Sequence, residues 1–175
     1  MDLKEMYEKV LGLKSVKRTG WVQKQIPGPE SVADHTFGVS FLALTIDLPE
    51  GVDRDKLLKM AVIHDVAEVE IGDQVLENGK KADEEKIREK HLEESKFSSK
   101  LFSNKKELND LFQEFIEQRT KTSKFLKELD KLEMAFQASK YREHGKDLAE
   151  FFENAEKYIE SQQVKEIFEE IRKSN

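Results

Sequence analysis

The 175-residue sequence has no cysteine, three prolines and eight glycines. The lack of cysteine excludes a disulfide framework and a thiolate metal site, and it favours a reducing, cytoplasmic location. The scarcity of proline and glycine excludes collagen-like and low-complexity chains. The longest apolar run, FLALTI at residues 41–46, is far too short to cross a bilayer. The first residues, MDLKEMYEKVLGL, carry acidic and lysine side chains throughout and do not resemble a signal or transit peptide.

The balance of charge is acidic, with a net charge of −6 at pH 7. A negative charge argues against sequence-independent binding to nucleic acid or to anionic lipid. We therefore expect a small-molecule partner, and neither nucleic acid nor a membrane. Charged residues make up 38% of the chain and hydrophobic residues 37%, which favours a helical protein. A chain of this length is expected to form one domain, residues 1–175, with a buried core.

Apolar residues recur at spacings of three and four along most of the chain, which indicates amphipathic helices. No segment alternates apolar and polar residues between turn signals, so no sheet is expected. The predicted helices cover residues 2–13, 31–47, 54–70, 83–99, 105–119, 122–144, 147–160 and 163–173. The glycines and prolines of residues 14–30, and the pair Asn78 and Gly79, predict loops. The sequence therefore predicts an all-α helical bundle.

The predicted helix 54–70 is apolar nearly all round, yet it contains His64, Asp65 and Glu68. An isolated buried charge is costly unless it is paired or bound to a metal. His64 and Glu68 are four residues apart and would share one face of a continuous helix. For this helix alone, a buried histidine satisfied by a neighbouring carboxylate is the simpler explanation.

Two further predicted helices bring the same kinds of residue inward. His35 lies on the core-facing stripe of helix 31–47, and Asp130 lies at the edge of the stripe of helix 122–144. With His64 and Asp65 they offer two imidazoles and two carboxylates, which suit a divalent cation such as Mn, Co, Ni, Fe, Zn or Mg. Because no cysteine is available, an octahedral ion with open water positions is favoured over tetrahedral structural zinc.

Four ordered segments strengthen the metal hypothesis: KRTGW at 17–21, PESVADH at 29–35, HDVAE at 64–68 followed by GD at 72–73, and LDKLEMAFQASKY at 129–141. Their H…HD…D order resembles the HD-domain metal-dependent phosphohydrolases. The resemblance extends over roughly residues 5–160. It is to the branch that contains the HD-domain-containing 2 proteins and the bacterial 5′-deoxynucleotidases.

The resemblance implies a single all-helical HD domain with a divalent metal in its core. It also implies hydrolysis of deoxyribonucleoside 5′-monophosphates to deoxynucleoside and phosphate. Matched by motif, the metal ligands are His35, His64, Asp65 and Asp130. The catalytic residues are Glu68, as the acid/base for the attacking water, and Asp73, which lines the same site. The substrate-binding residues are Arg18, which faces the phosphate, and Trp21, which walls the sugar or base.

This chain departs from the family pattern at two places. In bacterial members a tryptophan directly follows the arginine, whereas Thr19 and Gly20 separate Arg18 from Trp21 here. The family often continues the GD pair with an isoleucine and a proline, whereas this chain reads GDQVLENGKK. The pocket rim is therefore expected to differ, while the ligands are retained.

The chemistry of phosphate ester hydrolysis agrees with these residue types. A phosphomonoester dianion repels hydroxide, and a divalent metal supplies both positive charge and a nucleophile at neutral pH. A carboxylate one turn from a ligand can reach the attacking water, and the guanidinium of Arg18 matches phosphate oxygens. Two alternatives stay open. One is an HD-domain hydrolase of a signalling pyrophosphate or a phosphodiester, although Val69 departs from the HD-x-x-E-D pattern of those enzymes. The other is a non-catalytic helical scaffold stabilised by its metal.

Four other polar residues lie in the predicted helices 83–99 and 122–144. His91 and His144 lie in stretches rich in lysine and glutamate, so both are expected at the surface. Glu133 and Gln137 lie one and two turns beyond Asp130 and either orient the ligands or belong to the helix surface.

The resemblance further implies a homodimer. The C-terminal part carries more large aromatic surface than two terminal helices can easily bury, and aromatic residues are enriched in interface cores. The residues concerned are Phe136, Tyr141, Phe151, Phe152, Tyr158 and Phe168. The alternative is that these rings complete the core of one chain.

Overall fold

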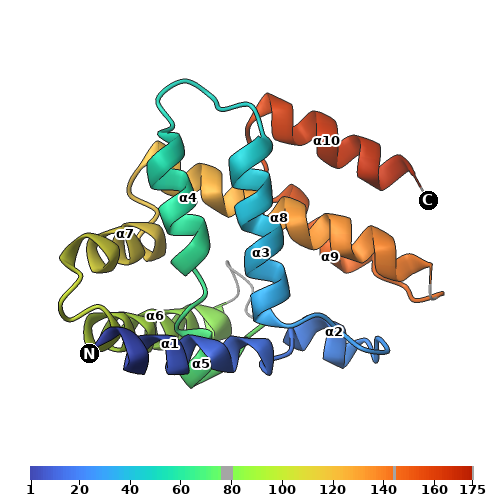
Figure 1. Ribbon diagram of the computed structural model, residues 1–175. Helices are drawn as coiled ribbons and strands as arrows, with labels where there is room; N and C mark the ends of the chain where they lie inside the picture. The colour runs from blue at the N-terminus through green and yellow to red at the C-terminus, as the bar shows by residue number, and fades with distance from the viewer. Residues whose placement is uncertain (76–80, 144, 175) are drawn as a thin grey trace.

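The regular structure is helical throughout the computed structural model, which describes residues 1–75, 81–143 and 145–174 (Figure 1). In chain order the elements are α1 (Leu3–Leu11), the 3-10 turn η1 (Gly12–Lys14), α2 (Thr19–Gln23), α3 (Val32–Thr45), α4 (Arg54–Ile63), α5 (Glu68–Ile71), α6 (Lys81–Leu101), α7 (Lys106–Ile116), α8 (Lys121–Arg142), α9 (Ala149–Glu156) and α10 (Gln162–Lys173). Within these ranges no strand forms, and the isolated β-bridge there joins Lys17 to Ser31. The predicted all-α fold is confirmed.

Helix α8 is the central element and packs against α3, α4, α7, α9 and α10. In Figure 1, α3 and α4 stand side by side and cross in front of α8, while α9 and α10 lie along its other end. The core-facing side chains of α8 are fully buried: Leu126, Leu129, Leu132, Ala135 and Ala138. A polar group on this core-facing side of α8 is therefore placed close to the centre of the molecule.

Helices α3, α4 and α8 each begin at a side chain that caps them. Ser31 caps α3 by accepting a hydrogen bond from the amide of Asp34, and the Asp34 carboxylate accepts one from the Ser31 amide in return. Asp53 caps α4, as the sequence predicts, and Thr120 caps α8. Such caps satisfy amides that have no partner within the helix, and they fix where each helix begins.

The predicted continuous helix 54–70 is wrong, because α4 ends at Ile63 and α5 begins at Glu68. Between them the backbone closes tighter turns, with Val66 bonded to the Ile63 carbonyl and Glu68 to the Asp65 carbonyl. Successive residues of a regular helix point about 100° apart. The interruption changes the angle between neighbouring side chains, so His64 and Asp65 both point to the same centre. His64 Nε2 lies 3.1 Å from Asp65 Oδ2.

The predicted loop 14–30 is also corrected, since it contains the short helix α2. Thr19, at the start of α2, is held by Asp73: its amide donates to the carboxylate at 2.5 Å and its hydroxyl donates to the carbonyl at 2.7 Å. Gly20 allows close packing, because a Cβ there would stand 2.9 Å from the ring of Phe151. These long-range contacts, absent from any local pattern, stabilise the helix.

The C-terminal aromatic residues mostly complete the core of one chain. Phe152 and Phe168 are each 2% exposed and Tyr141 is 7% exposed, while Phe151 is half-buried. Of the six residues only Phe136 is exposed, with an exposed fraction of 43%. The expectation that these rings form a dimer interface is therefore wrong for most of them, because α8, α9 and α10 bury them against one another.

No helix within residues 1–75, 81–143 and 145–174 is both long enough and apolar enough to cross a membrane. The predicted turn at Asn78 and Gly79 and the predicted surface residue His144 lie outside the described residues. So does part of the GDQVLENGKK segment, in which the family pattern is broken.

Candidate metal centre and active site

The four predicted ligands meet where α3, the turn after α4, and α8 converge. His35 Nε2 lies 3.2 Å from Asp130 Oδ1 and 3.6 Å from Asp65 Oδ2. His64 Nε2 lies 3.1 Å from the same Asp65 oxygen. Ligand atoms of His35, His64 and Asp130 all lie within 4.8 Å of one another. The structure thus brings together residues that are up to 95 positions apart in the sequence.

The donor atoms fit a divalent ion. His35 Nε2, His64 Nε2 and Asp65 Oδ2 are buried and have no hydrogen-bond partner among the described residues. Buried polar atoms are rarely left in this condition, so each indicates a missing partner. For metal bonds of about 2.1 Å, adjacent octahedral ligands stand about 3.0 Å apart, close to the spacings observed here. One ion would satisfy all three atoms together with Asp130.

The far ring nitrogens of both histidines are engaged, which turns Nε2 toward the centre. His64 Nδ1 lies 2.8 Å from the carbonyl of Ala61, to which it donates. His35 Nδ1 lies 2.5 Å from Glu133 Oε2. A partner on Nδ1 leaves the Nε2 lone pair for the metal. Glu133 therefore contacts a ligand and does not lie on the helix surface.

Charges around His35 compete. Burial and the charge of Arg18 lower its pKa, but the carboxylates of Glu133 and Asp130 outweigh them and raise the pKa of His35 to about 10. The metal-free centre therefore holds a proton at His35 at neutral pH. Gln137 takes no part in this network and hydrogen-bonds Tyr141.

Two lysines that the sequence analysis missed act on Asp130. Lys127 Nζ donates to Asp130 Oδ2 at 2.7 Å, which leaves Oδ1 facing His35. Lys131 Nζ lies 3.8 Å from the same Oδ2 atom. Burial would raise the pKa of Asp130, but Lys127, Lys131 and His35 hold it well below its usual range. Lys127 precedes Asp130 by three residues, a spacing at which side chains on a helix meet. This spacing is the feature of the sequence that could have predicted the pair.

Glu68 lies beside the ligand cluster at the start of α5. Its side chain is 3% exposed, and Oε1 accepts a hydrogen bond from Lys90 at 3.2 Å. Its other oxygen, Oε2, is buried without a hydrogen-bond partner in the described part of the chain. Burial and the nearby Asp65 charge raise the pKa of Glu68 well above its usual range. Lys90, from α6, is another residue that the sequence did not reveal.

Arg18 and Asp73 form a pair at the edge of the centre. Arg18 Nη1 donates to Asp73 Oδ1 at 3.0 Å and lies 3.7 Å from Asp65 Oδ2. Because Asp73 also holds Thr19, it fixes both the guanidinium and the start of α2. The arrangement places Arg18 next to the ligand cluster while Asp73 contacts Arg18 rather than the histidines.

Trp21 lines the cavity beside the site although it is only 1% exposed. Its indole N–H donates to Glu30 at 2.8 Å, and its ring stacks on Phe151 with the centroids 4.2 Å apart. Tyr141 meets it edge-on at 5.3 Å. Burial and the nearby Glu133 charge raise the pKa of Glu30 to about 7.

A cavity of about 640 Å³ opens over the centre. Its lining includes the polar residues Arg18, His64, Asp65, Glu68 and Asp130 and the aromatic rings of Trp21, Phe115, Phe151 and Tyr158. His91 also lines this cavity and is half-buried, which corrects its expected surface position. Burial and the charge of Lys90 lower the pKa of His91. The α6 helix turns this face inward against α5, a contact that its charge-rich sequence does not indicate.

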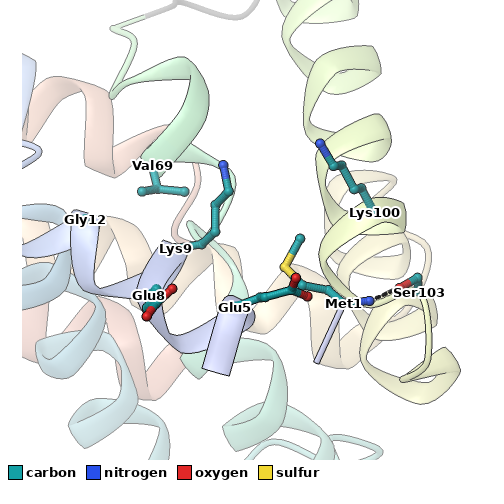
Figure 2. A pocket seen from close by; sticks show the side chains of 8 residues that line it. All are labelled: Met1, Glu5, Glu8, Lys9, Gly12, Val69, Lys100 and Ser103. Atoms are coloured by element: carbon teal, nitrogen blue, oxygen red, sulfur yellow. Dashed lines mark hydrogen bonds between the residues drawn. The ribbon is translucent and has the colours of Figure 1, made fainter. Parts of the chain in front are cut away.

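A second hollow, of about 830 Å³, lies apart from the ligand cluster between α1, α5 and α6 (Figure 2). It is lined by Met1, Glu5, Glu8, Lys9, Gly12, Val69, Lys100 and Ser103. The amino group of Met1 donates to Ser103 Oγ at 2.7 Å across its edge. It contains no histidine and none of the predicted site residues.

A family model described as an HD domain matches residues 10–172. The chain belongs to the HD domain family. An HD-domain relative, "5′-deoxynucleotidase HDDC2" of Danio rerio, is 38% identical over 165 residues, which cover 89% of this chain and 80% of that protein. The human protein of the same name is 35% identical over 136 residues, 75% of this chain and 64% of that protein. The predicted family is confirmed.

Solved structures agree with the HD-domain fold. The PH0347 protein from Pyrococcus horikoshii OT3 superposes with a TM-score of 0.78 at 30% identity, covering 97% of this chain and 98% of that one. A predicted metal-dependent phosphohydrolase from Magnetospirillum magnetotacticum MS-1 has a TM-score of 0.67 at 20% identity, covering 97% and 93%. The latter likeness supports the fold alone.

Proposed function

We propose that this chain is a metal-dependent phosphomonoester hydrolase, a 5′-deoxynucleotidase that converts deoxyribonucleoside 5′-monophosphates to deoxynucleoside and phosphate. The observation that carries the proposal is the convergence of His35 Nε2, His64 Nε2 and Asp65 Oδ2 beside Asp130, since these three atoms have no hydrogen-bond partner among the described residues. HD-domain relatives that are named 5′-deoxynucleotidase support the substrate class.

The residues that would hold the divalent cation are His35, His64, Asp65 and Asp130. When bound, the cation supplies positive charge for the phosphoryl oxygens and lowers the pKa of water. The protein contributes the geometry, because Glu133 and the Ala61 carbonyl fix the two imidazoles. With imidazole and carboxylate donors, the ion is one of Mn, Co, Ni, Fe, Zn or Mg.

Glu68 is the acid/base in this proposal. Lys90 holds one of its oxygens and leaves the buried Oε2 available to accept a proton from the attacking water. The raised pKa of Glu68 keeps the proton on the carboxyl group once it has been taken up, ready for the leaving alkoxide. The other carboxylate of α5, that of Glu70, does not take this role, because it is exposed and paired with Lys9.

Arg18 contacts the substrate phosphate, and Asp73 holds it in place. The guanidinium keeps N–H donors beyond the one given to Asp73, and donors in this planar fork match phosphate oxygens. The aromatic side chains that line the cavity, Phe151 among them, accept the sugar and base. Trp21 supports this aromatic lining through its stacked contact with Phe151.

The test is phosphate release from a panel of nucleotides. Purified protein is freed of metal and reloaded with each of several divalent ions, then offered 5′-deoxynucleoside and 5′-ribonucleoside monophosphates, pyrophosphates and cyclic diesters. The proposal expects metal-dependent release from the deoxyribonucleoside 5′-monophosphates. Preferred cleavage of a pyrophosphate or diester would replace the proposed substrate class, and no turnover with bound metal would indicate a metal-stabilised scaffold.

We further propose a homodimer that forms through the outer face of α3. Phe37, Phe41 and Leu44 lie on successive turns there and are 73%, 55% and 56% exposed. Exposed apolar residues clustered on one face favour an interface. Light scattering is expected to give twice the chain mass of 20.4 kDa, and F41E to give the single mass. L92E, on an exposed position of α6, serves as the control and keeps the wild-type mass.

The remaining parts of the proposal are a single HD domain over residues 1–175, a cytoplasmic location and no nucleic-acid partner. The family match over residues 10–172 supports one domain, and the absence of cysteine supports a reducing compartment. Limited proteolysis tests the domain organisation, since one domain is expected to resist cleavage as one fragment.

A further inference from the structure

Six basic side chains line the cavity over the metal centre: Lys124 and Lys157 are exposed, and the four half-buried ones are Arg18, Lys90, Lys127 and Lys131. Three of these four donate a hydrogen bond to a carboxylate: Arg18 to Asp73 at 3.0 Å, Lys90 to Glu68 at 3.2 Å and Lys127 to Asp130 at 2.7 Å. The carboxylate that pairs with Lys131 is that of Asp130, at 3.8 Å, which is beyond hydrogen-bond distance. Lys131 therefore differs from the other three in its position.

The neighbours of Lys131 hold its ammonium group in the cavity. Its Nζ lies 5.3 Å from the centroid of the Tyr158 ring, and its side chain is 16% exposed. A cation over an aromatic face is attracted by the ring and keeps its N–H donors. Lys127, the like-charged neighbour on α8, repels it, and so does Arg18. Within the described residues, Lys131 therefore carries a positive charge without a hydrogen-bonded carboxylate, and it lines the same cavity as Arg18.

A substrate phosphate would supply the missing anion. Its oxygens carry up to two negative charges and accept hydrogen bonds from ammonium groups. Lys131 directly follows the predicted ligand Asp130 in the sequence, so its ammonium reaches the cavity next to the metal centre.

Resting on the proposed function, we propose that Lys131 binds the phosphate group of the substrate, whereas Lys127 positions Asp130. The two lysines lie four residues apart on one face of α8, yet they divide these tasks. Lys127 uses its hydrogen bond to hold Asp130 Oδ2 and orient Oδ1, while Lys131 keeps its donors for the phosphate oxygens. The phosphate released by hydrolysis would occupy the same position.

The experiment measures two affinities in each of four proteins. Isothermal titration gives the affinity of the metal-free protein for Mn²⁺ and of the Mn²⁺-loaded protein for inorganic phosphate. The proteins are the wild type, K131M, K127M and K140M; Lys140 is an exposed residue of the same helix that pairs with Glu143. Methionine keeps the length of the side chain and removes the charge.

K131M is expected to weaken phosphate binding about tenfold or more, because a hydrogen bond to a charged group is lost, and to leave Mn²⁺ affinity within twofold. K127M is expected to weaken Mn²⁺ binding, and K140M to change neither. K131R, which restores the charge, is expected to recover part of the phosphate affinity. If circular dichroism shows that K131M is not helical, the charge-reversed K131E takes its place, and a tenfold loss of phosphate affinity is then required of K131E.

Wild-type phosphate affinity in K131M would overturn the proposal. So would a loss of Mn²⁺ affinity equal to that of K127M, because Lys131 would then act through Asp130. Absence of phosphate binding by the Mn²⁺-loaded wild type would overturn it as well. The proposed function fails separately, if the wild type hydrolyses no 5′-monophosphate while its phosphate affinity still depends on Lys131.

Discussion

The two halves of the metal centre are built in different ways. His35 and Asp130 belong to the continuous helices α3 and α8, and Glu133 supports His35 from the same long helix. His64 and Asp65 lie in the interrupted stretch between α4 and α5, followed at once by Glu68. A continuous helix presents few inward positions for each turn and holds them rigidly. The interruption places several functional groups inward within a few residues, so this half can carry chemistry as well as ligands.

The largest expected effect comes from the interrupted half. E68Q removes the acid/base and is expected to lower kcat by about 10²–10⁴-fold, with metal content unchanged. Phosphate release under saturating metal measures the loss, and E70Q on the exposed side of α5 is the matched control. Near-normal turnover in E68Q would assign proton transfer to another group, with Asp73 the first candidate.

The continuous half is expected to govern metal affinity instead. E133A removes the partner of His35 Nδ1, and loss of such a partner typically weakens metal binding by roughly 10–100-fold. Titration of the metal-free protein measures the change. Q137A, one turn further along α8 and outside the network, should bind metal as the wild type does. Equal affinities of E133A and wild type would remove Glu133 from the site.

Metal affinity is expected to depend on pH through the same half. The pKa of His35, about 10 without metal, exceeds its usual 6.5. Its proton therefore stabilises the metal-free fold fully below about pH 6.5, and this contribution is lost as the pH rises through about 10. Metal must displace this proton, so affinity should rise by about tenfold per pH unit between 6 and 9. E133Q, which removes a charge that raises this pKa, should flatten the dependence, and an unchanged slope would contradict the assignment.

A smaller effect is expected from the packing behind His35. A Cβ at Gly38 would stand 2.8 Å from Glu133 Oε1 and 2.9 Å from its Cγ. G38A should displace this flexible side chain and lower metal affinity by less than E133A does. Alanine is also the better helix former, so thermal stability of the metal-free protein should not fall. Metal affinity equal to that of the wild type would show that Glu133 adjusts without cost to the site.

The continuous half was also the half that the sequence could predict. His35 and Asp130 follow from apolar stripes with helical period, and the ordered motifs identify the family. The break after Ile63 could not be predicted from the same periodicity, because the residues on both sides of it are apolar and satisfy a helical pattern. The tight turns become evident only through the contacts among His64, Asp65 and their partners on other helices.

The basic residues of the cavity escaped prediction for a different reason. Lys90, Lys127 and Lys131 lie in segments where a lysine ordinarily covers a solvated face. Their long side chains reach inward to carboxylates that come from elsewhere in the chain, such as Glu68. The partner of Trp21, Phe151, is likewise 130 positions away. Local patterns give the helices and the ligands, while the charge balance of the cavity depends on their packing.

Metal content after removal of one ligand from each half shows directly whether the two halves bind the same ion. H64A combined with D130A is purified, offered Mn²⁺, dialysed and analysed for metal, beside the wild type and H91A, whose imidazole lines the cavity outside the ligand cluster. Stoichiometric metal is expected in the wild type and in H91A, and none in the double variant. Stoichiometric metal retained by the folded double variant would contradict a centre built from His35, His64, Asp65 and Asp130.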